Sequence, residues 1–130
     1  MRAFVDTNVV VRHLTGDPPA QARRATALLG GRHELLLVDL VLAELVYVLE
    51  SYYERPRGEV AMLARSLLAL RSIVVIDDLL LLRAIELYES ERLGFAEAYL
   101  IAAAETSGVG VVVSFDRRID RARSIRRIEP

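Results

Sequence analysis

Phe4-Val5-Asp6-Thr7-Asn8 joins a short apolar run to three polar residues near the start of the chain. Near the other end, Val111-Val112-Val113-Ser114-Phe115-Asp116 repeats the arrangement, with a β-branched run that leads into an aspartate. Continuous apolar runs of this kind are typical of strands buried on both faces of a parallel sheet. Open α/β sheets bind their ligands at the carboxyl ends of such strands. The two stretches therefore predict two parallel strands, each followed by an acid at the functional edge.

Strand-like runs alternate with helical segments along the whole chain. The predicted strands cover residues 2–5, 34–38, 72–76, 109–114 and, as a short fifth, 125–128. The predicted helices cover residues 8–14, 20–29, 40–53 and 59–70, one from Asp77 or Asp78 to about residue 92, and one that carries Glu97 and runs to Ser107. This alternation predicts an α/β fold. We expect a central parallel sheet of four to five strands with helices on both faces.

Acids, prolines and glycines mark the expected helix starts. Asp17 precedes Pro18, which is the pattern of an N-cap acid followed by proline at the first helical position. Asp39 and either Asp77 or Asp78 are expected to cap the helices that follow them rather than to take part in chemistry. Gly94 is an acceptable cap for the helix that carries Glu97.

Length and composition indicate one domain, residues 1–130, with a well-filled core. The chain has 130 residues, of which 53% are hydrophobic and none is cysteine. The absence of cysteine excludes disulfides and thiolate metal sites, so a cytoplasmic location is the expectation. No apolar run approaches the ~20 residues that span a bilayer, because Asp39 and Glu44 interrupt the best candidate. We therefore expect no membrane association.

The charge of the chain is distributed unevenly. Its net charge is -1, so no global basic field attracts nucleic acid. All 17 basic residues are arginine, a bias that the composition of the source genome also explains. Six of them lie between Arg117 and Arg127, directly after the last acid of the proposed site. Arginine forms bidentate contacts with phosphate. The residues considered for contact with a phosphodiester substrate, with a solvated surface as the alternative, are Arg12, Arg117, Arg118 and Arg121.

Four carboxylates are the candidates for catalysis: Asp6, Glu44, Glu97 and Asp116. Acids within apolar sequence are costly to bury unless a cation or hydrogen bonds compensate them. In a doubly wound sheet, the strands that end at Asp6 and Asp116 can be neighbours across the ligand crevice. Oxygen ligands without histidine or cysteine favour Mg²⁺ or Mn²⁺ over zinc. The four acids therefore predict a divalent-metal site.

Each acid also has a purely structural alternative. Asp6 could form a turn with Asn8, Glu97 could complement a helix dipole, and Asp116 could end a strand in a turn. Asp120 is expected to pair with an arginine at the surface. His13 and His33 have no partner at ligand or triad spacing. The tyrosines Tyr47, Tyr52 and Tyr53 are expected mainly in the core, with a dimer or partner groove as the alternative.

The order of these motifs resembles the PIN domain. The matching pieces are Val5-Asp6-Thr7-Asn8, Ala43-Glu44-Leu45, Phe95 to Ala102 and Ser114-Phe115-Asp116-Arg117-Arg118, so the resemblance covers nearly the whole chain. In length and in its arginine-rich tail the chain looks most like the VapC-type ribonuclease toxins of VapBC toxin–antitoxin pairs.

The resemblance implies a fold, an activity and partners. It implies a Mg²⁺- or Mn²⁺-dependent endoribonuclease in which the four acids hold the metal or its bound water. Asn8 and Ser114 would orient these groups by hydrogen bonds. It also implies an RNA substrate, a homodimer and a cognate antitoxin protein that blocks the pocket.

Two nearby positions depart from the family pattern. The third acid is usually aspartate and is Glu97 here, and position 94, often a second aspartate, is Gly94. Because Mg²⁺ tolerates geometric change poorly, the departure leaves two readings open: a shifted working site or a weakened nuclease that binds RNA or protein. A phosphoryl-accepting receiver domain is a third reading. The absence of any lysine to contact the phosphoryl group disfavours it.

Overall fold

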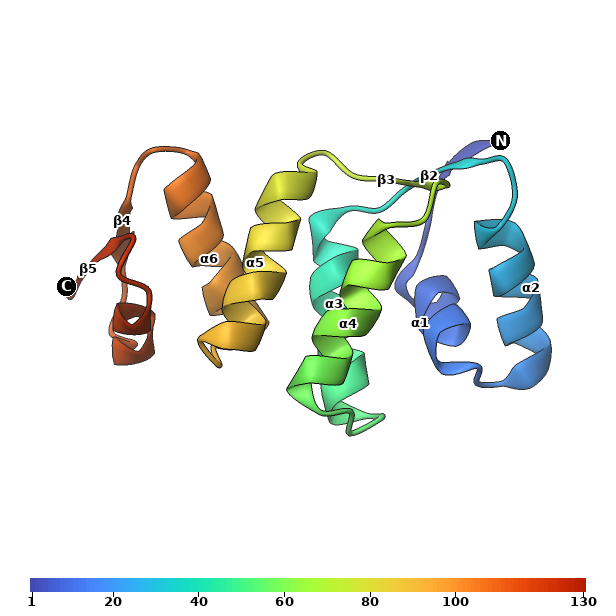
Figure 1. The fold of residues 1–130 in the computed structure, drawn as a ribbon, viewed down its shortest axis with the longest axis horizontal. Coiled ribbons are helices and arrows are strands. Elements are labelled where there is room, and N and C mark those ends of the chain that lie inside the picture. The colour runs from blue at the N-terminus through green and yellow to red at the C-terminus, as the bar shows by residue number, and fades with distance from the viewer. The chain divides into compact units, whose positions relative to one another are not determined.

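The computed structural model describes residues 1–130, and its six α-helices alternate with short strands along the chain (Figure 1). The chain divides into two compact units, Met1–Ile76 and Asp77–Pro130. Each unit contains its own parallel strands and its own helices. No helix is long and apolar enough to cross a membrane.

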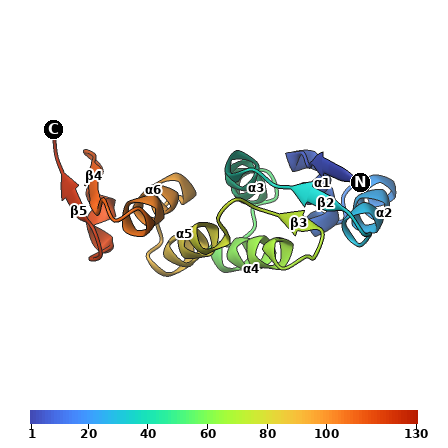
Figure 2. The ribbon, with the colours of Figure 1, turned by 90° about the horizontal axis from the view of Figure 1, so that it is seen from above.

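The first unit contains a three-stranded parallel sheet and four helices. Its elements are β1 (Arg2–Phe4), α1 (Thr7–Thr15), α2 (Pro19–Leu29), β2 (Glu34–Leu36), α3 (Asp39–Ser51), α4 (Arg57–Leu68) and β3 (Ile73–Val74). The strand order is β1-β2-β3, as the view from above shows (Figure 2). Leu35 lies at the centre of the register, opposite Ala3 on one side and Ile73 on the other. Asp6 therefore follows the carboxyl end of an edge strand.

Helix α3 determines where Glu44 lies. Its buried side chains recur at the spacing of one helical face, at Leu42, Leu45, Val46 and Leu49. Glu44 lies between them in sequence but outside that face, and it is exposed. The apolar face thus fixes the helix in the core and leaves the Glu44 carboxylate accessible.

The second unit contains a helical pair and a two-stranded parallel sheet. Its elements are α5 (Asp78–Ser90), α6 (Phe95–Thr106), β4 (Val111–Val113), the 3₁₀-helix η1 (Arg117–Arg121) and β5 (Arg126–Ile128). Helices α5 and α6 lie side by side in both views (Figures 1 and 2). Tyr88 packs edge-on against Phe95, with ring centroids 6.2 Å apart. This contact and the buried Ala98 and Ile101 hold α6, and with it Glu97, against α5.

The predicted α/β class is confirmed, whereas the predicted single sheet of four to five strands is not. The strands are parallel as expected, but hydrogen bonds join three of them in one sheet and two in another. The prediction that both faces of every strand are buried is also wrong. Leu35 and Val112 are buried, but Phe4 and Val113 are exposed, since β1 is an edge strand and β4 pairs only with β5.

The helix starts are partly as predicted. Asp77 caps α5 by accepting a hydrogen bond from the backbone N–H of Leu80 at 3.0 Å, and Gly94 is the N-cap of α6. The predictions for Asp17 and Asp39 are wrong. Helix α2 begins at Pro19 with Pro18 as its N-cap, and the Asp17 carboxylate accepts from the Tyr53 hydroxyl instead. Helix α3 already includes Asp39, and its N-cap is Val38.

Candidate metal site

Asp6 is fixed by the start of α1. It is the N-cap residue, and its Oδ1 accepts a hydrogen bond from the Thr7 backbone N–H at 2.8 Å. Its Oδ2 accepts from the Asn8 side-chain amide at 3.2 Å. The Asn8 side chain therefore contacts the Asp6 carboxylate, and its role in orienting a metal ligand stays a prediction. Each carboxylate oxygen has two lone pairs, so these bonds leave acceptor capacity on both oxygens.

Thr7 connects Asp6 to Glu44. Its side chain is 8% exposed, and its hydroxyl donates a short hydrogen bond to Oε2 of Glu44. The same residue thus donates to Asp6 through its backbone and to Glu44 through its side chain. Sequence reasoning assigned no role to Thr7. The available signal was a hydroxyl on the buried face of α1, at the spacing of Val10 and Val11.

These groups line one cleft of the first unit, with a volume of about 690 Å³. Arg12 also lines it and is held by its own bonds, because its Nη1 donates to the Asn8 carbonyl at 3.1 Å and its Nε donates to Gln21. The remaining wall includes Tyr47, Tyr52 and Tyr53. The expectation that these tyrosines are mainly core residues is wrong for Tyr47 and Tyr52, which are 68% and 75% exposed.

Glu97 lies in the first turn of α6, as predicted, and is half-buried. Its carboxylate folds back over the N-cap, so that a Cβ at Gly94 would overlap Oε2. The space of a side chain at position 94 is therefore taken by the longer side chain at position 97. The two departures from the family pattern occupy a single site in space.

Asp116 is held by its neighbours on both sides. Its backbone N–H donates to the Ser114 hydroxyl at 2.9 Å, whereas the predicted role of Ser114 in orienting a carboxylate or water stays a prediction. Its carboxylate accepts from the Arg118 side chain, with Nη2 at 2.7 Å from Oδ2 and Nε at 3.0 Å from Oδ1. These bonds, together with the Arg118 backbone N–H, lower the pKa of Asp116 from 3.8 to about 2.

The four candidate arginines differ in how freely they could meet an RNA phosphate. Arg118 is paired with Asp116, and Arg121 donates to the carbonyls of Glu91 and Arg92 at 3.2 and 3.0 Å. Arg12 is bonded as described above. Arg117 is exposed and its guanidinium has no hydrogen-bond partner. Asp120 pairs with Arg127, whose Nε lies 3.0 Å from its Oδ1, which confirms the predicted surface ion pair.

Within each unit, two of the four predicted acids are linked. Asp6 and Glu44 share Thr7 in the first unit. In the second, the bonds and charge of Asp116 raise the pKa of Arg118, and the charge of Glu97 adds to the effect, so both acids act on one guanidinium. Neither unit contains a group of three or more histidines, aspartates and glutamates within reach of one metal ion. The convergence of all four acids stays a prediction.

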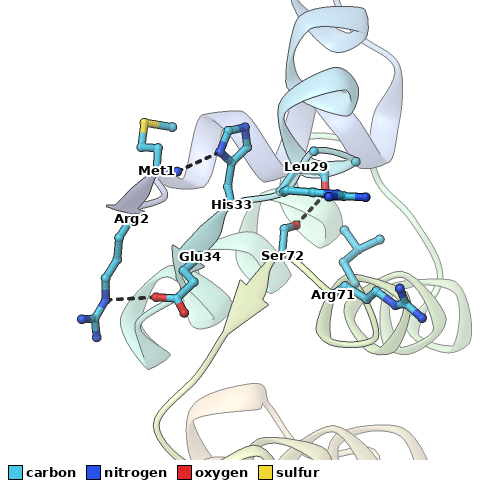
Figure 3. A pocket seen from close by; sticks show the side chains of 11 residues that line it. Met1, Arg2, Leu29, His33, Glu34, Arg71 and Ser72 are labelled. Atoms are coloured by element: carbon cyan, nitrogen blue, oxygen red, sulfur yellow. Dashed lines mark hydrogen bonds and ion pairs between the residues drawn. The ribbon is translucent and has the colours of Figure 1, made fainter.

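A second cleft lies at the opposite end of the strands of the first unit (Figure 3). Its only acid, Glu34, is paired with Arg2, whose Nε lies 3.3 Å from Oε2. Ser72 donates to the Leu29 carbonyl at 2.6 Å and closes the floor. Arg32 and Arg71 follow the carboxyl ends of α2 and α4, where positive charge stabilises a helix dipole. This cleft therefore lacks the acids of a metal site.

Comparison with known proteins assigns the fold family. Curated proteins give no match. Among solved structures, the chain resembles the crystal structure of VapBC2 from Rickettsia felis bound to a DNA fragment from their promoter. That similarity has 17% identity and a TM-score of 0.41, over 99% of this chain and 98% of that one. The family model described as PIN domain matches residues 3–125. Because this match spans nearly the whole sequence, the chain belongs to the PIN domain family.

Proposed function

We propose that this PIN domain is a divalent-metal-dependent endoribonuclease that hydrolyses RNA phosphodiester bonds. PIN domains are generally nucleases, and this chain belongs to that family. The observation that carries the proposal is the pair of carboxylates, Asp6 and Glu44, joined through Thr7 at the wall of one cleft. Two carboxylates that line one cleft and share a hydrogen-bond donor offer oxygen ligands to a divalent cation. A structural role in helix capping explains Asp6 but not the exposed Glu44 beside it.

The donor atoms fit Mg²⁺ or Mn²⁺. All candidate ligands are carboxylate oxygens, which these ions prefer. Oε1 of Glu44 and both oxygens of Glu97 accept no hydrogen bond, so they are available as ligands. In the proposal Asp6, Glu44, Glu97 and Asp116 hold the ion or its water. When bound, such an ion lowers the pKa of a water molecule and neutralises charge on the phosphate.

The surrounding residues keep these carboxylates oriented and charged. Thr7 and Asn8 donate to Glu44 and Asp6 and limit their rotation. Ser114 anchors the backbone of Asp116, and Arg118 keeps its carboxylate ionised well below neutral pH. Arg117 is exposed and makes no hydrogen bond, so its guanidinium is open to a phosphate of the substrate.

The biological setting that we propose is a toxin–antitoxin pair. The motif order and length resemble VapC-type toxins, for which the partner is a small antitoxin protein that blocks the pocket. A homodimer is part of the same proposal. Expression of the chain alone is expected to arrest bacterial growth, and co-expression with the product of a small neighbouring open reading frame is expected to restore it.

A cleavage assay tests the activity. Purified protein is expected to cut single-stranded RNA in Mn²⁺ or Mg²⁺ and to lose activity in EDTA. Asp6→Asn is expected to lower the cleavage rate about 100-fold or more. Even the loss of a residue that only hydrogen-bonds to a metal ligand lowers metal affinity or activity about 10–100-fold. Asp120→Asn is the matched control, because Asp120 is an exposed acid already paired with Arg127. Cleavage that survives Asp6→Asn would rule the proposal out.

The second candidate function is a PIN-like module that binds RNA or protein without cutting. The position of the Glu97 carboxylate over Gly94 favours it, because the third acid is rearranged relative to the family pattern. This candidate predicts RNA binding or partner binding with no cleavage in either metal ion.

A further inference from the structure

The cleft that contains Asp6 and Glu44 has an aromatic wall. Tyr47 and Tyr52 line it with most of their surface exposed. Tyr47 follows Glu44 by three residues on α3, so the two side chains lie on the same side of the helix. The proposed metal ligands and an exposed ring are thus presented to the same space.

The second ring is held in place by a third. Tyr52 contacts Tyr53 edge-on, with ring centroids 4.9 Å apart. Tyr53 is itself anchored, because its hydroxyl donates to Asp17 at 3.0 Å. Tyr52 therefore has a fixed support while its own ring remains open to solvent. An exposed ring with fixed support loses little conformational freedom when a planar ligand stacks on it.

The same cleft contains a positioned cation. The Arg12 guanidinium is oriented by the Asn8 carbonyl and by Gln21, and it lies between the acids and α2. An arginine beside aromatic rings is the combination that binds single-stranded nucleic acid, with phosphate on the cation and bases on the rings. A duplex does not offer its base faces in this way, because neighbouring bases cover them.

We propose that this cleft is a base-stacking subsite for single-stranded RNA, with nucleobases on Tyr47 and Tyr52 and a phosphate on Arg12. The inference rests on the proposed nuclease function and assigns two exposed rings and one cation to the binding of its RNA substrate. Any base can stack on an aromatic ring, so the subsite prefers single-stranded to double-stranded RNA but does not select a base sequence. The adjacent acids would then receive the phosphodiester next to a stacked base.

Binding can be measured separately from cleavage. The probe is a fluorescein-labelled single-stranded RNA 12-mer in EDTA, where no metal-dependent cleavage occurs, and the readout is anisotropy. Tyr47→Ala and Tyr52→Ala are each expected to weaken binding about tenfold, and Tyr47→Phe and Tyr52→Phe to bind like the wild type. Leu40→Ala is the matched control, because Leu40 is also on α3 and 75% exposed but lies outside the cleft. A duplex of the same sequence is expected to bind at least about tenfold more weakly.

A second readout uses the intrinsic fluorescence of the protein. The chain has 5 tyrosines and no tryptophan, so stacked bases are expected to quench tyrosine emission directly. The alanine variants are expected to fold normally, because both rings are exposed, and circular dichroism checks this.

The outcomes separate this inference from the proposed function. Unchanged binding by both alanine variants overturns the subsite, whereas Mn²⁺-dependent cleavage by the wild type would leave the nuclease proposal standing. Equal affinity for single strand and duplex also overturns it. Loss of antitoxin neutralisation with unchanged RNA binding would assign the tyrosines to a protein partner and overturn it. A wild-type protein that neither binds nor cleaves single-stranded RNA would contradict both the nuclease proposal and the stacking subsite.

Discussion

Gly94 and Glu97 act as a pair at the start of α6. The Glu97 carboxylate occupies the space that a side chain at position 94 would need. Gly94→Ala is therefore expected to displace the carboxylate and weaken Mn²⁺ affinity about tenfold, in the range seen when groups around a metal are disturbed. Folding should change little, because the displaced atom is the end of a flexible side chain and the backbone at Gly94 is extended, with φ -61°.

Mn²⁺ titration and thermal unfolding together check this prediction. In the Glu97→Asp background the shorter side chain leaves this space empty. Adding Gly94→Ala should therefore weaken Mn²⁺ affinity less than it does in the wild type. An equal loss of Mn²⁺ affinity in both backgrounds would show that positions 94 and 97 act independently.

Arg118 controls the ionisation of Asp116. Its side chain supplies the main effect that lowers the pKa of Asp116 to about 2, so Arg118→Ala should raise this pKa toward 3.8. A carboxylate whose pKa is lowered by folding contributes its full stabilisation at a pH above its pKa in the unfolded chain. This contribution is lost as the pH falls through about 2, the pKa of Asp116 in the folded protein. In Arg118→Ala the folded and unfolded pKa values of Asp116 should nearly coincide, so most of this pH-dependent stabilisation should be absent.

Carboxyl ¹³C NMR titration measures the pKa directly. Arg117→Ala is the matched control, since Arg117 is the adjacent arginine and makes no hydrogen bond to Asp116. An equal shift in both variants would contradict the assigned role of Arg118.

Helices α5 and α6 are joined by an ion pair. Arg83 donates to both carboxylate oxygens of Glu105, at 2.8 and 3.0 Å, and also pairs with Glu86 on its own helix. The Glu105 side chain is 18% exposed and that of Glu86 is 61% exposed. Glu105→Ala should therefore lower the free energy of unfolding by about 1 kcal/mol, and Glu86→Ala by a few tenths, about 0.3 kcal/mol. Urea denaturation of the two variants checks the difference. Equal effects would show that the link between the helices contributes nothing beyond a surface pair.

Elements were more predictable than their connections. The helix over residues 95–106 and the cap at Asp77 follow from local periodicity and side-chain chemistry, which act over a few residues. The hydrogen bond from Thr7 to Glu44 joins residues 37 positions apart in the sequence. The ion pair between Arg118 and Asp116 depends on the turn into η1. Such contacts depend on tertiary packing. The same reason explains why the division of the strands into two sheets was not predicted.

At the scale of the whole molecule, the order of four acids in the sequence predicted the family. The match to the PIN domain over residues 3–125 supports that prediction with a signal spread over nearly the whole chain. The structure adds what the order of acids could not give: the bridge through Thr7 in one unit and the shared Arg118 in the other. That Asp6, Glu44, Glu97 and Asp116 hold one metal ion stays a proposal.

Mn²⁺ binding, followed by the electron paramagnetic resonance signal of the free ion, tests this claim most directly. The wild type is expected to bind Mn²⁺ saturably, and Asp6→Asn and Asp116→Asn are each expected to weaken binding at least about tenfold, because both acids would lose a place at the same site. Asp120→Asn should bind like the wild type, since Asp120 pairs with Arg127. Wild-type affinity in Asp116→Asn, with loss in Asp6→Asn alone, would contradict a single ion held by both acids.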